Sequence, residues 1–140
     1  RTGMRPGLEM RTEDYCLISY VEEADEFLVN GEHEPSSESF LHYLIYARFP
    51  EVKVIMHGHS SLLNRFAGDL GIAETAREYP YGTKELGRAA LAILNEDISF
   101  IIMKNHGFVA IGPDIQTTAQ RILQCYGRLL QQLPLLVSSG

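Results

Sequence analysis

Hydrophobic residues in the first third of the chain predict two strands and a helix. Aromatic and aliphatic residues crowd positions 15–21 and 27–29, which predicts two short strands, the second followed by an Asn-Gly turn signal. Serines suitable as caps then precede a predicted helix that places Glu38 in its first turn and ends at Phe49-Pro50. Its apolar positions, at helical spacing, are Phe40, Tyr43, Leu44 and Ala47.

The middle of the chain predicts a strand that ends in two histidines. Residues 52–56 are rich in β-branched side chains and lead directly into His57-Gly58-His59. Ser60 can then cap a short helix. The two histidines are therefore expected at a strand terminus.

The last part of the chain predicts a helix, two strands around a turn, and a final helix. The first helix is predicted over residues 83–95. Strands are predicted over 98–103 and 108–111, and His106 lies in the Asn-His-Gly turn between them. The final helix is predicted over 114–134, up to a proline. The chain is therefore expected to have an α/β architecture, with helices against a mixed or antiparallel sheet.

Composition and charge narrow the class of protein. The chain has 140 residues, which fits a single domain over 1–140, and a missing N-terminal segment is expected because the sequence begins at Arg1. Eighteen acidic against twelve basic residues give a net charge of −6, which disfavours nucleic acid or an anionic membrane as partner. No apolar run reaches the roughly 18 residues of a membrane span, and residues 1–10 lack the apolar core of a signal peptide. We therefore expect a cytoplasmic protein. We also expect its two cysteines, Cys16 and Cys125, to be reduced residues of the core.

Three histidines at strand ends are the first candidates for chemistry. Because residues i and i+2 of a strand point to the same side, His57 and His59 can direct their imidazoles to one point. A third imidazole, that of His106, would complete a site of three neutral nitrogens with an open position, which is the catalytic form of a zinc site. Taken alone, a His-x-His pattern is also typical of surface or hydrogen-bonded histidines.

An acid and two hydroxyls at the start of the first helix are further candidates. Glu38 lies among unpaired amides that stabilise its charge, although an acid at a helix start is common without any function. Ser36 and Ser37 are ordinary caps, but hydroxyls beside a helix N-terminus also form an anion site suited to phosphate. His42 follows Glu38 by one turn, so a hydrogen bond between them is expected rather than metal ligation.

The order and approximate spacing of these motifs resemble the class II aldolase/adducin family. The motifs are Pro35-Ser36-Ser37-Glu38 with His42, His57-Gly58-His59-Ser60, Tyr81-Gly82-Thr83-Lys84-Glu85-Leu86, and Asn105-His106-Gly107 followed by Gly112. Thr2-Gly3 also resembles a turn that precedes the family's next strand. The resemblance covers about residues 1–130.

The resemblance implies a fold and a set of site residues. The fold would be a three-layer α/β/α arrangement around a central, mainly antiparallel sheet. A divalent metal, zinc first with manganese or cobalt as alternatives, would be held by His57, His59 and His106. Glu38 would be the catalytic acid/base, and the substrate phosphate would be bound by Ser36, Ser37 and Thr2. The family also implies a homo-oligomer, a tetramer, that acts on a small-molecule sugar phosphate.

The implied activity is that of a metal-dependent lyase, an aldolase that cleaves a small ketose phosphate through a metal-stabilised enediolate. A sugar-phosphate dehydratase or 4-epimerase of the family is the nearest alternative, and a non-catalytic adducin-like binding module is the alternative from another class. Glu38 favours an aldolase or dehydratase, since epimerases of the family carry aspartate at this position. The stretch between His59 and Tyr81 is shorter than in the sugar-phosphate aldolases and lacks a counterpart of their catalytic tyrosine.

Overall fold

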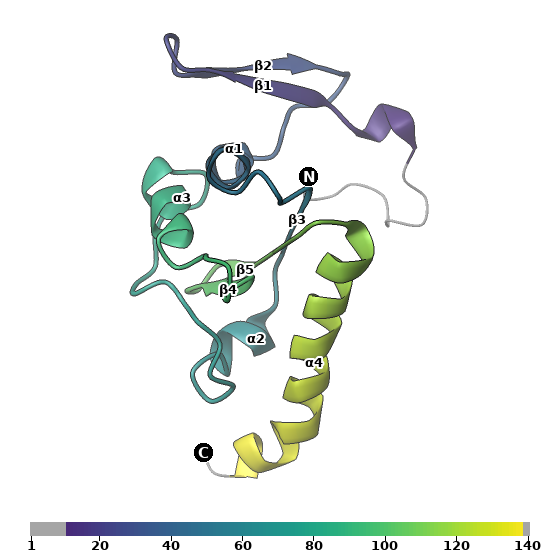
Figure 1. Cartoon of the computed structure of the whole chain (residues 1–140). Helices are drawn as coiled ribbons and strands as arrows, with labels where there is room; N and C mark the ends of the chain where they lie inside the picture. The colour runs from purple at the N-terminus through teal and green to yellow at the C-terminus, as the bar shows by residue number, and fades with distance from the viewer. Residues whose placement is uncertain (1–10, 139–140) are drawn as a thin grey trace.

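The computed structural model describes residues 11–138, so the candidate phosphate ligand Thr2 lies outside the described residues. Helices and strands are interspersed along the chain, as the hydrophobic pattern predicts (Figure 1). In chain order they are the 3-10 helix η2 (Thr12–Asp14), β1 (Leu17–Val21), β2 (Glu26–Asn30), α1 (Ser39–Arg48), β3 (Val54–Gly58), α2 (Ser61–Arg65), α3 (Lys84–Leu91), β4 (Phe100–Met103), β5 (Gly107–Gly112) and α4 (Ile115–Ser138).

The central sheet has three antiparallel strands in the order β3-β5-β4. Strand β5 lies in the middle and is buried along its whole length, which explains its continuous run of small and apolar residues. Gly58 at the end of β3 pairs with Phe108, and Met103 at the end of β4 pairs with Gly107. The end of β3 and the β4–β5 turn therefore meet at the same edge of the sheet.

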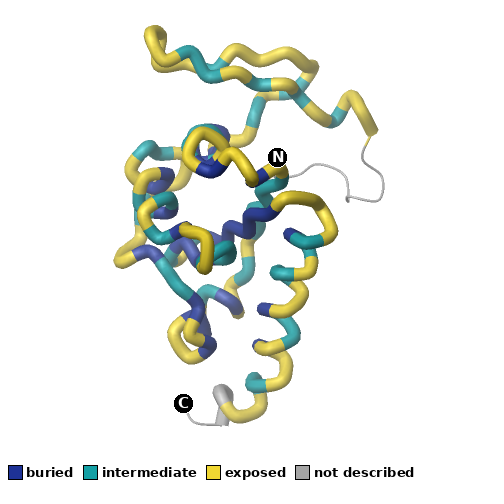
Figure 2. The backbone as a smooth tube through the Cα atoms, in the orientation of Figure 1, coloured by how far each residue is buried: buried dark blue, intermediate teal, exposed yellow. Residues whose placement is uncertain are grey.

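Two hydrophobic clusters cover the two faces of this sheet. Alternate strand residues point to opposite sides, so Ile101 and Val109 pack with α1 and α3, whereas Ile102 and Phe108 pack with α2 and α4. Burial is concentrated on the sheet and on the sides of the helices that face it (Figure 2). The expected three-layer α/β/α fold with an antiparallel central sheet is confirmed.

Strands β1 and β2 form a separate two-stranded hairpin that lies beyond α1 from the central sheet (Figure 1). Tyr20 contacts the rings of Phe40 and Tyr43 on α1, with centroid separations of 5.6 Å and 4.4 Å. Asp25, in the hairpin turn, forms an ion pair with Lys84 at the start of α3. Isolated hairpins are marginal in water, so these contacts with α1 and α3 hold the hairpin in place.

Two helix caps lie where the sequence predicts them, whereas the start of α1 and the end of α4 differ from the prediction. Ser60 and Thr83 accept hydrogen bonds from backbone amides three residues on, as expected of N-caps. Helix α1 begins one residue later than predicted, so Glu38 is its N-cap residue rather than part of the first turn. Helix α4 continues through Pro134, although a proline inside a helix removes a backbone hydrogen bond and clashes with the preceding turn. Leu133 beside it packs against the core.

The two cysteines differ in burial. Cys125 lies in the core, as predicted, and the prediction that Cys16 is also a core residue is wrong. Cys16 precedes β1 at the edge of the hairpin, where only one face of the strand pair has a partner to pack against. Among the described residues, no helix combines the length and the apolar character that a membrane span requires.

Candidate metal centre and the adjacent acid

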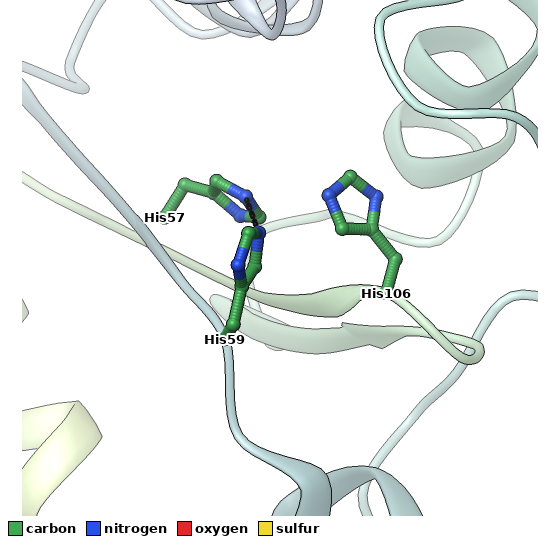
Figure 3. Close-up of side chains that lie close together, drawn as sticks. All are labelled: His57, His59 and His106. Carbon is green, nitrogen blue, oxygen red and sulfur yellow. Dashed lines mark hydrogen bonds between the residues drawn. The ribbon is translucent and has the colours of Figure 1, made fainter. Parts of the chain in front are cut away.

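Three imidazoles converge at the sheet edge where β3 ends and β5 begins (Figure 3). His57 lies in β3, His59 is the first residue after β3, and His106 lies in the turn between β4 and β5. One ring nitrogen from each histidine lies within 4.8 Å of the others, and His57 Nε2 lies 3.0 Å from His59 Nε2. Nitrogens bound to one ion at about 2.0–2.1 Å would be separated by roughly 3.3 Å. The three rings are therefore spaced as ligands of a single ion would be.

The hydrogen bond of His57 fixes which of its nitrogens can face an ion. His57 Nδ1 lies 2.9 Å from the carbonyl oxygen of Phe108, which can only accept, so Nδ1 carries the proton. Nε2 of the neutral ring then presents a lone pair toward His59. Burial lowers the pKa of His57, against the opposing effect of the Phe108 hydrogen bond. The ring is thus neutral at pH 7, the state that a metal ligand requires.

His106 faces both the other histidines and the acid. Its Nε2 lies 3.8 Å from Glu38 Oε1. Burial lowers the pKa of His106, and the nearby Glu38 carboxylate opposes this shift. His106 Nδ1 is buried without a hydrogen-bond partner among the described residues. The position of this ring therefore depends on the turn that carries it.

Glu38 is buried beside the histidine cluster and is held there by a distant backbone amide. Its side chain is 4% exposed, and Oε1 accepts a hydrogen bond of 2.9 Å from Gly82 N–H. Gly82 has a φ of +70°, a conformation that disfavours other residues, and a Cβ there would lie 3.1 Å from Ser37 Cβ. Gly82 thus allows the loop before α3 to approach the carboxylate.

Gly107 leaves the space that the imidazoles occupy. A Cβ on this residue would lie 2.3 Å from the carbonyl oxygen of Gly58, 2.8 Å from His59 Cδ2 and 3.0 Å from His57 Cε1.

Three neutral imidazole nitrogens with a further position open to substrate match the ligand chemistry of a divalent ion such as zinc. The residues present therefore fit a metal.

The serines suggested for phosphate binding lie next to Glu38, at the start of α1. Both are exposed. Ser36 Oγ accepts a hydrogen bond of 3.2 Å from Glu38 N–H, which leaves its own proton free to be donated. Ser37 adjoins Gly82, as the close approach at that glycine shows. Both hydroxyls are thus near the acid, and neither is buried.

Contrary to the prediction, the hydrogen bond that the Glu38 carboxylate accepts does not come from His42. Glu38 Oε1 accepts from Gly82 instead, and His42 is linked to Glu38 through the backbone, with His42 N–H donating to the Glu38 carbonyl at 3.1 Å. Burial lowers the pKa of His42 to about 4, and repulsion from His57 adds to the shift. His42 is thus a neutral histidine close to His57.

Acidification is expected to destabilise the metal-free protein through His42. Its pKa is about 4 in the folded state and 6.5 in the unfolded state, so the unfolded chain binds more protons between these values. The free energy of unfolding is highest above pH 6.5. It falls by about 3 kcal/mol in total as the pH drops from 6.5 to about 4. Urea unfolding at several pH values in chelator measures this slope.

The His42→Gln variant should lose the part of this slope that comes from His42, whereas His57 and His106, whose pKa values burial also lowers, should keep their parts. A His33→Gln variant, which removes a loop histidine, should keep the whole slope. An unchanged slope in His42→Gln would assign the pH dependence to other groups.

Two glycines that shape the site were not identified as functional from the sequence. Gly82 and Gly107 each lie within a motif that resembles the family, so the residues themselves were visible. Their roles depend on what approaches them, and the partners are Glu38 and the two histidines of the His-x-His pair. A turn glycine next to a candidate ligand is the signal that could have pointed to them.

Known proteins match most of the chain. The family described as "Class II Aldolase and Adducin N-terminal domain" matches residues 6–129. A curated relative, 5-deoxy-D-ribulose 1-phosphate aldolase of Bacillus thuringiensis serovar kurstaki, is 28% identical over 135 residues, which cover 84% of this chain and 61% of the relative.

Solved structures show the same fold. An L-fuculose 1-phosphate aldolase matches with a TM-score of 0.71 and 21% identity, over 95% of this chain and 66% of that one. A sugar-phosphate aldolase from Thermotoga maritima matches with a TM-score of 0.64 and 24% identity, over 78% and 59% of the two chains. The chain thus spans about three fifths of the length of these relatives. From the match over residues 6–129, together with the motifs and the fold, the chain belongs to the class II aldolase and adducin N-terminal domain family.

Proposed function

We propose that this protein is a metal-dependent lyase that cleaves a small ketose phosphate by a retro-aldol reaction. The observation that carries the proposal is the convergence of three imidazoles and one buried carboxylate at a single sheet edge. The relatives named as sugar-phosphate aldolases support the substrate class. A homo-oligomer remains part of the proposal, supported by the exposed apolar residues Ile115, Leu123, Leu130 and Leu135 on α4.

The proposed ligands are His57, His59 and His106. When bound, a divalent ion, zinc first and manganese or cobalt as alternatives, supplies a Lewis acid that polarises a ketose carbonyl and stabilises the negative charge that develops on its oxygen. Neutral imidazoles suit this task because they leave the full positive charge of the ion available to the substrate. The hydrogen bond from His57 Nδ1 to the Phe108 carbonyl keeps one of these ligands correctly oriented.

Glu38 is the proposed acid/base. Its carboxylate lies 3.8 Å from His106 and therefore borders the ligand set. In the cleavage direction it would give a proton to the carbon next to the carbonyl, and in the condensation direction it would take the proton from the same carbon. The Gly82 amide fixes one carboxylate oxygen, so the group acts from a defined position.

Ser36, Ser37 and Thr2 are the proposed ligands of the substrate phosphate. The two serines lie at the N-terminus of α1, where unpaired backbone amides favour an anion. They are exposed and adjoin Glu38, so a phosphate bound there would place the sugar beside the acid.

The burial of Glu38 favours an enzyme over a binding module. An acid that is 4% exposed and lies beside three imidazoles costs stability unless its partners compensate. A scaffold has no need for this arrangement, whereas proton transfer next to a bound ion depends on it. The dehydratase and 4-epimerase alternatives would use the same residues and differ in the bond that breaks.

Metal content and product analysis test the proposal. Elemental analysis of the purified protein should find about one divalent ion per chain, and the His57→Ala variant should fold and lose it. A panel of ketose phosphates should then give aldehyde release with the wild type alone. Loss of water without aldehyde would favour the dehydratase. Absence of metal, even after incubation with zinc, manganese or cobalt, would favour the binding module.

A further inference from the structure

The position of His106 rests on a different support from that of the other two histidines. His57 and His59 are separated by one residue on a continuous backbone, so their spacing follows from the end of β3 and the residue after it. His106 lies in the tight turn between Met103 and Gly107, in which Asn105 has a φ of +57°. Its Nδ1 makes no hydrogen bond among the described residues that could fix the ring.

A buried threonine from another segment holds this turn. Thr75 is 1% exposed, and its hydroxyl oxygen accepts a hydrogen bond of 2.9 Å from Lys104 N–H, the first turn residue. The same hydroxyl donates to the carbonyl of Arg77 at 2.9 Å. Both functions of the hydroxyl are thus used, and it links the backbone of Lys104 to that of Arg77.

The threonine is itself anchored on the sheet. Thr75 N–H donates to the Ile102 carbonyl at 3.0 Å, and Ile102 N–H donates to the Ala73 carbonyl at 2.9 Å. The segment around Thr75 therefore runs beside β4, next to the turn that it supports. Ile102 is fully buried, so this anchor is part of the core.

The turn also closes on itself through a hydrogen bond of 2.9 Å from His106 N–H to the Met103 carbonyl, and its other side-chain contacts involve residues more exposed than Thr75. Lys104 Nζ lies 3.3 Å from Glu74 Oε1, and Asn105 Nδ2 donates to Glu78 Oε2 at 2.8 Å. Exposed ion pairs and hydrogen bonds of this kind contribute little to stability. The Thr75 hydroxyl comes from a fully buried residue, and losing it would leave the Lys104 N–H without this acceptor.

We infer that Thr75 is a positioning residue that fixes the turn carrying His106 and thereby sets the affinity of the three-histidine site for a divalent ion. The inference rests on the proposed function for the metal. Ligand distances must be met within about 0.2 Å, so a small shift of the turn weakens binding. Groups that orient ligands typically change metal affinity by about 10–100-fold when they are removed.

The test compares Thr75→Val with Thr75→Ser and with a matched control, Thr118→Val. Thr118 is also fully buried, and its hydroxyl donates to the Asp114 carbonyl at 2.7 Å within α4, away from the histidines. We expect Thr75→Val to weaken Co²⁺ binding by about 10–100-fold in competition with a chromophoric chelator. Thr75→Ser should stay within about threefold of the wild type, and Thr118→Val should lower stability without changing Co²⁺ affinity.

Amide hydrogen exchange in the metal-free protein gives a second readout. Thr75→Val should accelerate exchange at Lys104 by at least about tenfold relative to Thr75→Ser and Thr118→Val. Unchanged exchange at Lys104, or Co²⁺ affinity that falls equally in Thr75→Val and Thr118→Val, would overturn the inference. Wild-type protein without any metal affinity would contradict the proposed function, while the exchange rates would still decide whether Thr75 holds the turn.

Discussion

Replacement of Glu38 by glutamine is expected to leave metal binding intact and to lower kcat by roughly 10²–10⁴-fold. Glutamine has the same shape, and its Oε1 can still accept the hydrogen bond from Gly82 N–H. The buried position at the start of α1 is therefore retained, and the three histidines keep their places. Only the capacity to take up and release a proton is lost. Turnover of a cleaved ketose phosphate and Co²⁺ affinity, measured on the same preparation, separate the two effects.

Glu85→Gln is the matched control for this variant. Glu85 is an exposed acid in the first turn of α3, only three residues beyond the glycine that holds Glu38. The charge change is identical, so kcat should remain at the wild-type level. Undiminished turnover in Glu38→Gln would exclude Glu38 as the essential acid/base, and loss of metal in that variant would indicate that the carboxylate holds the ligand set together.

Replacement of Gly107 by alanine is expected to disrupt the metal centre. The added Cβ would lie 2.3 Å from the Gly58 carbonyl oxygen, which is backbone and cannot rotate away. Strands β3 and β5 would have to separate where His57 and His59 emerge, which moves both rings relative to His106. We expect Co²⁺ affinity to fall by about 100-fold or more and the free energy of unfolding to fall by about 1–3 kcal/mol.

Gly127→Ala provides the comparison. This glycine lies in α4, and a Cβ there would have no atom within 4 Å. Alanine in a helix interior stabilises by up to about 1 kcal/mol, so this variant should be as stable as the wild type or more stable, with normal Co²⁺ affinity. If Gly107→Ala binds Co²⁺ as tightly as Gly127→Ala does, the close approach at Gly107 is not needed for the site.

Local sequence determined the elements and the placement of one pair of proposed metal ligands. The apolar spacing predicted the helices and strands, and the caps Ser60 and Thr83 lie where the sequence placed them. The side-by-side placement of His57 and His59 also follows from the sequence, because residues two apart on a strand share a side. These features depend on neighbours along the chain, so a local pattern contains them.

The complete site was decided by tertiary structure. His57 is bonded to the Phe108 carbonyl, 51 positions away, and Glu38 is held by the Gly82 amide, 44 positions away. Thr75 is bonded to Lys104, 29 positions away, in the turn that carries His106. Each of these contacts depends on the register of β3 and β5 and on how loops pack against that sheet edge. The pairing register of two strands is set by which face of the sheet is buried as a whole. A local sequence pattern therefore does not predict which residues will lie opposite one another.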